Sequence, residues 1–129
     1  IVFGSDVADI DDIEVNSLYQ EARKCTSDGA FTAAVLCCRK LLMHVAVAKG
    51  AQADKSFIEY VQFLADKNYI PPDAKDWVDL IRQKGNEANH EISMMKSDDA
   101  KDLIDFSGML LTLIYEFPAA IKKKRTTEL

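Results

Sequence analysis

The stretch Ala30–Lys49, AFTAAVLCCRKLLMHVAVAK, is apolar on almost every side when it is wound into a helix. Such a helix is stable only where other elements cover it, so this stretch predicts a central helix with further helices around it. Its exceptions are Arg39, Lys40 and His44, which need water or partners because an unpaired buried charge is costly. We interpret Arg39 as a cation at the rim of the bundle. The alternatives are that it pairs with a core carboxylate or reaches the polar site described below. His44 is interpreted as a half-buried structural histidine rather than a ligand.

The first predicted helix precedes this stretch. Asp11, Asp12 and Glu14 form an acidic cluster of the kind that caps a helix N-terminus and compensates its dipole. Apolar residues then recur at three- and four-residue spacing as far as Cys25, and Asp28-Gly29 is a turn signal. We therefore favour a helix cap over a cation site for the acidic cluster.

Three more helices are predicted after it. The third covers residues 57–65 and ends before Pro71-Pro72, because proline disfavours helix in the residue that precedes it. The fourth starts at a capping Asp73, and the fifth starts at residues 97–99 and ends near Pro118. In the fourth helix the side chains expected to face inward are Trp77, Leu80 and Ile81. Short connections favour antiparallel neighbours, so the expected fold is all-α, an antiparallel bundle of about five helices.

Length and composition fit a single domain. With 129 residues, of which 48% are hydrophobic, the chain can bury roughly two thirds of its unfolded surface around one core. We expect an extended lead-in at residues 1–10, one helical domain at 11–120 and a basic tail at 121–129. The first residue is Ile rather than Met, so we expect the chain to be a fragment of a longer protein. We also expect either additional domains outside this fragment or a separate protein partner.

Charge and cysteine content narrow the classes of function. A net charge of −5 argues against a general nucleic-acid coat, and the run of cations at 122–125 is interpreted as a solvated helix end rather than a phosphate contact. The chain has no secretory signal pattern and no uninterrupted apolar run of about 20 residues, so we expect no membrane contact. Cys25, Cys37 and Cys38 lack the spacing of a metal site. They predict reduced core residues of a cytoplasmic protein, with no metal and no cofactor.

One polar stretch, LIRQKGNEANH at residues 80–90, carries the functional signal. If the fourth helix continues through Gly85, then Arg82, Asn86 and His90 share one face. Arginine binds phosphate through a rigid fork, and histidine titrates near neutrality. Together they suit metal-independent RNA cleavage, in which His90 takes the ribose 2′-hydroxyl proton and Arg82 stabilises charge on the phosphate.

Helix geometry separates these two groups. Eight residues of helix span about 12 Å, so either a break at Gly85-Asn86 or a second copy of the domain is needed to complete the site. An architectural alternative ends the helix at Lys84 and places Gly85 in the left-handed conformation. In that alternative Asn86, Asn89 and His90 only satisfy backbone groups at the turn.

The phrase Ile81-Arg82-x-x-Gly85-Asn86-x-Ala88-x-His90 resembles the signature of domain of unknown function 4145, a helical family found near the end of type I restriction enzyme subunits and in small bacterial proteins. Other parts of the chain agree in order, namely Tyr19-x-Glu21-Ala22, Ala33-Ala34-Val35-x-Cys37-Cys38-Arg39, Trp77 and Tyr115-x-Phe117-Pro118. That family is similar to the HEPN superfamily of small helical bundles. Its active ribonucleases use an arginine, a following polar residue and a histidine, usually across a dimer interface.

The resemblance implies a HEPN-like fold with Arg82 and His90 as catalytic residues and Gln83 as the polar residue between them. Asn86, Asn89 and Arg39 complete the candidate site as binding residues. This chain departs from the pattern in its wider Arg82–His90 spacing, in Gln83 itself, and in Met43, which stands where the family often has an acidic residue.

Two hypotheses of function follow. In the first, the chain is a HEPN-like domain of a nucleic-acid-directed or defence-related system, such as restriction or toxin–antitoxin. It is then a homodimer that contacts RNA or another nucleic acid, and it includes metal-independent ribonuclease activity. In the second, it is a non-catalytic helical interaction or dimerisation module of a larger protein. A nucleotide-binding bundle is disfavoured, because no glycine-rich phosphate loop follows a strand.

Overall fold

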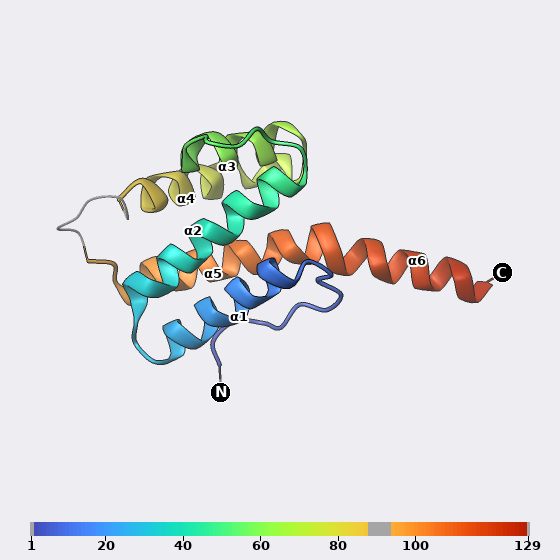
Figure 1. The fold of residues 1–129 in the computed structure, drawn as a ribbon, viewed down its shortest axis with the longest axis horizontal. Helices are drawn as coiled ribbons and strands as arrows, with labels where there is room; N and C mark the ends of the chain where they lie inside the picture. The colour runs from blue at the N-terminus through green and yellow to red at the C-terminus, as the bar shows by residue number, and fades with distance from the viewer. Residues whose placement is uncertain (1, 88–93, 129) are drawn as a thin grey trace.

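The chain forms a bundle of helices in a computed structural model that describes residues 2–87 and 94–128 (Figure 1). The helices are α1 (Ile13–Ser27), α2 (Phe31–Ala48), α3 (Phe57–Asp66), α4 (Lys75–Glu87), α5 (Ser97–Leu111) and α6 (Phe117–Glu128). A 3₁₀ turn, η1 (Pro72–Ala74), precedes α4, and a π-helical turn, η2 (Thr112–Glu116), joins α5 to α6. α5, η2 and α6 form one continuous helix, so the described residues form five long helices if this one is counted once. The predicted all-α bundle of about five helices is confirmed.

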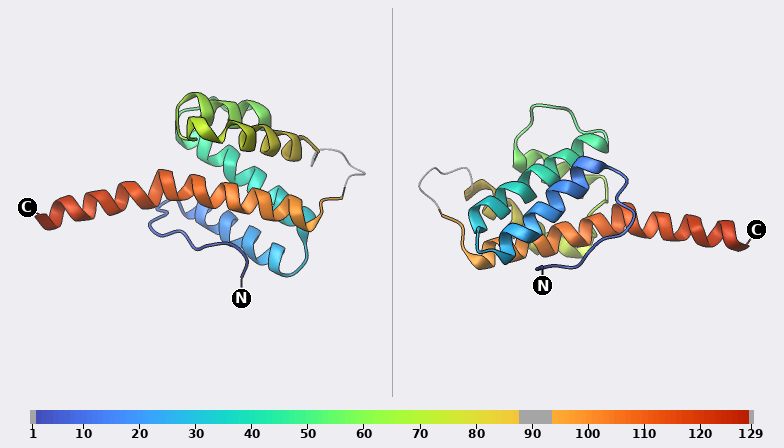
Figure 2. Two further views of the ribbon diagram at one scale, coloured as in Figure 1. Left: turned by 180° about the vertical axis from the view of Figure 1, so that it is seen from behind. Right: turned by 60° about the horizontal axis from the view of Figure 1, so that its bottom comes forward.

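α2 is the central helix, as its composition predicts. It contacts α1, α3 and α5, while α4 contacts α3 and α5 from the other side (Figures 1 and 2). Its inner side chains are fully buried, namely Ala34, Val35, Cys38, Leu41, Leu42, Val45 and Ala46. Complete burial of a large aliphatic side chain stabilises a fold by about 1.5–3 kcal/mol. The buried side chains of α2 therefore contribute a large part of the free energy that stabilises the core.

The predicted helix ends agree with the structure in the N-terminal half. Asp12 is the N-cap of α1, and its Oδ1 accepts a hydrogen bond of 3.1 Å from the Val15 amide. α2 is followed by Gly50 at φ 109°, and α3 by Asn68 at φ 63°, both in the left-handed region that ends helices. The acidic cluster therefore has the capping role that the sequence predicts.

Two predictions about α4 are wrong. Asp73 was expected to cap the helix, but it lies inside η1, and α4 begins at Lys75. Leu80 was expected to face inward, but its side chain is 38% exposed, whereas Val78 and Ile81 are buried. The inward face passes through Val78 and Ile81, which share a face by helical spacing, with Trp77 at its edge against Phe106.

Pro118 does not end the last helix, contrary to the prediction. A proline in a regular α-helix clashes with the carbonyl four residues earlier, here that of Ile114. The π-helical turn η2 relieves this clash, because the Phe117 amide donates to the carbonyl of Thr112, five residues earlier. The helix therefore continues through the predicted tail as far as Glu128.

The N-terminal segment packs against the bundle, whereas the C-terminal helix projects from it. Residues 2–12 contain no helix and run beside α1 and the long C-terminal helix (Figure 2). Val7 is buried, and Tyr19 donates a 2.7 Å hydrogen bond to the Ser5 carbonyl. α6 projects past the bundle, where Lys123 contacts Asp9 at 2.9 Å.

α2 and the continuous helix Ser97–Thr126 have the length and composition of membrane spans. Core helices of soluble proteins share that length and composition, and buried residues make up 44% and 39% of the two spans. α2 packs against three other helices, which is the arrangement of a core helix.

Gly108 provides a test of the packing between α1 and α5. A Cβ at this position would lie 2.7 Å from the hydroxyl oxygen of Tyr19, which is buried and held by Ser5. Gly108→Ala should therefore lower the free energy of unfolding by about 1–3 kcal/mol, although alanine favours helix over glycine. Chemical denaturation measures the change. Adding Tyr19→Phe removes the obstructing oxygen, so the double variant should be more stable than Gly108→Ala alone; equal or lower stability would contradict the clash.

Candidate functional site

The backbone of the polar stretch is helical through Gly85. α4 runs to Glu87, so Arg82, Gln83 and Asn86 all belong to one helix. The alternative in which Lys84 ends the helix and Gly85 adopts the left-handed conformation is wrong. A mid-helix glycine costs only about 1 kcal/mol, and the flanking Gln83, Lys84 and Glu87 all have high helix propensity, which offsets this cost.

The residues of the predicted catalytic pair are placed unequally. His90 and Asn89 lie outside the described residues, and for Arg82 and Asn86 only the backbone is described. Gln83 has an exposed side chain on α4. The geometry between the Arg82 guanidinium and the His90 imidazole therefore stays a prediction.

Arg39 is half-buried, which agrees with a cation at the rim of the bundle. Its guanidinium carbon lies 5.5 Å from the centre of the Phe57 ring, and its buried Nε makes no hydrogen bond within residues 2–87 and 94–128. Burial lowers the pKa of the guanidinium, but arginine stays charged in proteins at any working pH. The described contact is a cation–π contact with α3 rather than an ion pair with a core carboxylate.

The three cysteines are free thiols, and two of them are held protonated. Burial, followed by the hydrogen bond to Glu21 at 2.8 Å, raises the pKa of Cys37 to about 12. Burial also raises the pKa of Cys38 to about 12. Because the thiolate is the reactive form, neither is suited to nucleophilic chemistry near neutral pH.

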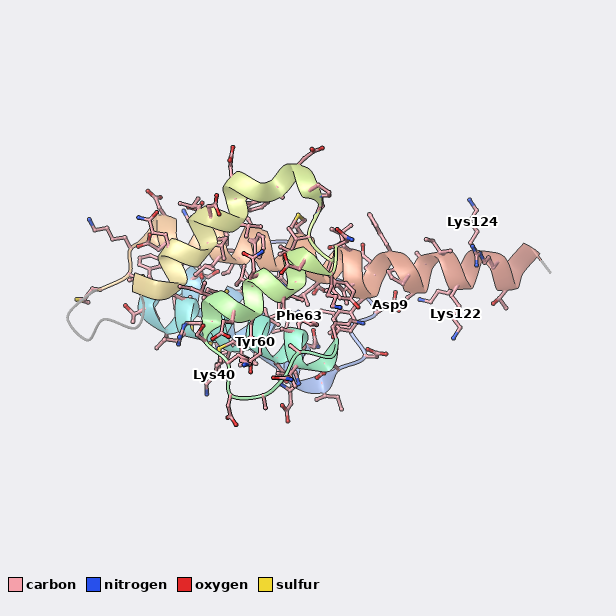
Figure 3. All side chains as sticks on the ribbon, turned by 90° about the horizontal axis from the view of Figure 1, so that it is seen from above. Asp9, Lys40, Tyr60, Phe63, Lys122 and Lys124 are labelled. Atoms are coloured by element: carbon pink, nitrogen blue, oxygen red, sulfur yellow. The ribbon has the colours of Figure 1, made fainter. Side chains whose placement is uncertain are left out.

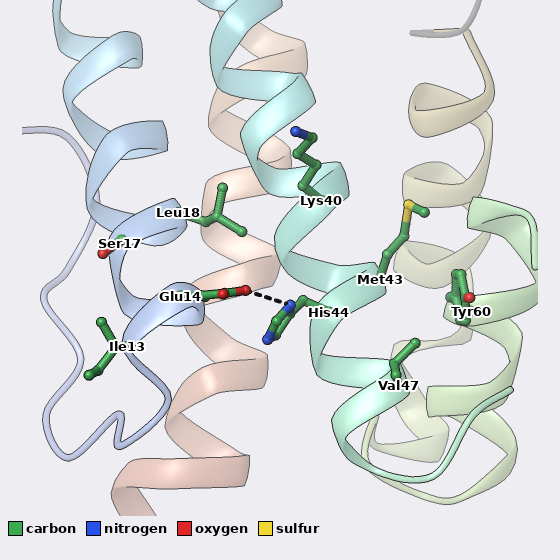
Figure 4. Close-up of a pocket in the computed structure, with 9 residues that line it drawn as sticks. All are labelled: Ile13, Glu14, Ser17, Leu18, Lys40, Met43, His44, Val47 and Tyr60. Carbon is green, nitrogen blue, oxygen red and sulfur yellow. Dashed lines mark ion pairs between the residues drawn. The ribbon is translucent and has the colours of Figure 1, made fainter. Parts of the chain in front are cut away.

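A concave surface of the described structure lies away from the polar stretch. α1, α2 and α3 enclose an open groove of about 600 Å³, which we call the α1–α2–α3 groove (Figure 4). Its apolar lining is Ile13, Leu18, Met43, Val47 and Tyr60, and its polar lining is Glu14, Ser17, Lys40 and His44. Sequence reasoning did not predict this surface.

Two of the apolar residues that line the groove are exposed. Ile13 is 81% exposed at the start of α1, and Val47 is 44% exposed near the end of α2. Leu36, Lys40, Met43 and Val47 fall on one face of α2 by helical spacing. The composition of Ala30–Lys49, apolar also on its outer face, was the signal that could have located this surface.

Two carboxylates hold His44 at the edge of the groove. Its Nε2 lies 3.3 Å from Asp12 Oδ2, and its Nδ1 lies 3.4 Å from Glu14 Oε2. Asp12 thus uses one oxygen to cap α1 and the other to fix the histidine on α2. His44 is half-buried and ties two helices together, which agrees with its predicted structural role.

This arrangement suits binding better than catalysis. Ser17 and His44 share the groove, but the Ser17 side chain points away from His44 (Figure 4), and no hydrogen bond joins them in the described structure. Within residues 2–87 and 94–128, no group of three or more His, Cys, Asp or Glu could hold a metal ion. The groove offers apolar surface with an acidic edge.

Comparison with known proteins places the chain in a family. Residues 20–128 match the family described as domain of unknown function DUF4145. The chain belongs to this family. No curated protein and no solved structure matches the chain. The match spans α2 to α6 and most of α1, so it includes the long helix that projects from the bundle.

Two substitutions of Asp12 distinguish the stability that comes from capping α1 from the stability that comes from the contact with His44. Asp12→Ala removes the N-cap of α1, so the free energy of unfolding should fall by about 1–2 kcal/mol. Asp12→Asn keeps a good cap and removes only the charge that faces His44. Its effect should stay within about 0.5 kcal/mol, because half-exposed ion pairs contribute little. Urea denaturation of both variants measures the difference; equal losses would show that the His44 contact, not the cap, is the stabilising interaction.

Proposed function

We propose that this domain is a helical interaction module whose α1–α2–α3 groove binds an amphipathic helix of a protein. The observation that carries the proposal is the groove's apolar lining, in which Ile13 and Val47 are exposed. Grooves between helices commonly bind the apolar face of a partner helix, which presents anchors at i, i+3 or i+4 and i+7.

Charge defines the kind of helix that would fit. Glu14 lies in the groove, and Asp11 and Asp12 precede it at the start of α1. Lys40 lies at the opposite end of the groove from Ile13 (Figure 4). A helix with a narrow apolar stripe and cations beside it would therefore match the end of the groove formed by α1.

A designed helical peptide tests this binding directly. A peptide with leucines at i, i+4 and i+7 and flanking lysines should shift the NMR signals of the Met43 and Val47 methyl groups saturably. A peptide of the same composition in scrambled order should not. Val47→Lys, which places a cation against the apolar stripe, should weaken binding roughly tenfold or more.

Leu80→Lys is the matched control, since it alters an exposed leucine on α4 outside the groove. The proposal fails if the scrambled peptide binds equally well, or if the two lysine variants weaken binding to the same degree.

As a second candidate we propose the HEPN-like function, in which the domain serves a defence-related or restriction-type system in the cytoplasm as a homodimer and cleaves RNA without metal. The continuity of α4 through Gly85 keeps Arg82, Gln83 and Asn86 on one helix, as in the ribonuclease motif that the sequence resembles, so a second copy of the domain would be needed to complete the site. Active members usually complete their site across a dimer. In this proposal, additional domains or a protein partner would bring the nucleic acid to this domain.

RNA cleavage in the presence of a chelator tests the second candidate. Arg82→Ala and His90→Ala should each abolish cleavage while changing the free energy of unfolding by less than about 1 kcal/mol. Lys67→Ala, which removes an exposed cation at the end of α3, should leave cleavage unchanged. Gel analysis of a mixed RNA substrate measures the activity. An inactive wild-type protein, or loss of folding in both alanine variants, would exclude the ribonuclease role.

A further inference from the structure

We infer that the helix bound in the α1–α2–α3 groove is α6 of a second copy of this chain, so that two copies exchange their C-terminal helices reciprocally. The inference rests on the proposed binding of an amphipathic helix and names the partner. It brings together two features of one molecule, an apolar groove with an acidic end and an apolar helix with a basic end.

α6 has few contacts with the rest of the bundle, among them the ion pair of Lys123 with Asp9 and a cavity that Phe117 lines with Val7. It projects beyond the bundle as the continuation of α5, and among the described elements its main contacts are with η2, from which it extends (Figures 1 and 2). Phe117 and Ile121 are 52% and 54% exposed and stand four residues apart, so they share one face. α6 is stabilised as the continuation of α5, and a partner on this face would bury both apolar side chains.

The charges of the two surfaces are opposite. α6 carries Lys122, Lys123, Lys124 and Arg125 against Glu128, four cations less one carboxylate, or +3, and Lys123 among them already pairs with Asp9 of the same chain. Since the whole chain carries −5, the remainder carries −8. The part of that negative charge nearest the groove is Asp11, Asp12 and Glu14.

The dimensions of the two surfaces also agree. The lining of the groove on α2, from Lys40 to Val47, spans eight residues, or about 12 Å, and so does the stretch of α6 from Phe117 to Lys124. With Phe117 toward Lys40, the cations of α6 would lie against the acidic start of α1. The apolar residues Phe117 and Ile121 would then contact Met43 and Val47.

The same chain cannot fill its own groove. Seen from above, Lys40 and Tyr60 lie on the side of the bundle, whereas Lys122 and Lys124 lie far along the projecting helix (Figure 3). α6 continues α5 through η2 and points away from the groove, so only a second molecule can bring α6 to it. A twofold exchange forms the contact twice, which doubles the buried area and closes the assembly as a dimer.

Mixing two complementary variants tests the exchange in the intact chain. Ile121→Glu places a carboxylate on the apolar face of α6. This carboxylate stands four residues before Arg125, and a pair of opposite charges at this spacing preserves the helix. Val47→Lys spoils the groove. Light scattering and sedimentation should show a wild-type dimer, and each variant should dimerise roughly tenfold more weakly or worse. An equimolar mixture should recover a mixed dimer, because one intact α6 can then meet one intact groove.

A charge exchange provides an independent arm of the test. Glu14→Lys and Lys124→Glu should each weaken the dimer, and both changes in one chain should restore it. Leu80→Lys is the control and should leave the dimer unchanged. Circular dichroism should show native helix content in every variant, since each altered side chain is exposed.

Three outcomes would overturn the inference: a monomeric wild type, a dimer that resists both Ile121→Glu and Val47→Lys, or a mixture that stays monomeric. It is also overturned if the Lys124 variant loses RNA affinity while the mass of every species stays unchanged, because α6 would then be a nucleic-acid contact. Binding of the designed peptide distinguishes the two proposals. A groove that binds the peptide but not α6 contradicts only the exchange, whereas a groove that binds neither contradicts the interaction module as well.

Discussion

The burial of α2 by three other helices is the constraint on which the rest of the fold depends. A helix that is apolar nearly all round gains free energy from every neighbour, so α1, α3 and α5 all pack against it. α4 completes the bundle through α3 and α5 rather than through α2 itself. One strip of α2, from Leu36 to Val47, lies where α1 and α3 diverge, and its apolar residues remain partly exposed there. The groove is therefore a direct consequence of an excess of apolar surface on the central helix.

The polar contacts around this helix explain why the groove has an acidic end. Asp12 must stand at the start of α1 as its cap, and Glu14 lies in the first turn, where the helix dipole favours negative charge. His44 then joins both carboxylates to α2 and holds the two helices in register. Residues with an ordinary structural purpose thus give the edge of the groove a charge opposite to that of α6.

The candidate ribonuclease residues and the groove occupy different parts of the fold, and they differ in how far sequence could predict them. Helical spacing predicted that Arg82 and Asn86 lie on one helix if that helix continues through Gly85, and α4 does continue to Glu87. His90 and Asn89 lie outside the described residues. The groove carries no short motif, because it is formed by Ile13, Val47 and Tyr60 from three separate helices, and no local pattern relates such residues.

The amino-acid sequence by itself determined the all-α class, the central position of α2 and the ends of the first three helices, because periodicity, caps and left-handed turns are local properties. Tertiary structure decided the inward face of α4, where Val78 rather than Leu80 is buried in the core. It also decided the course of the chain past Pro118, because a π-helical turn accommodated the proline and extended the helix away from the bundle. These outcomes depend on how a few residues of backbone rotate whole helices, and such rotations are set by the packing of distant side chains rather than by the local sequence.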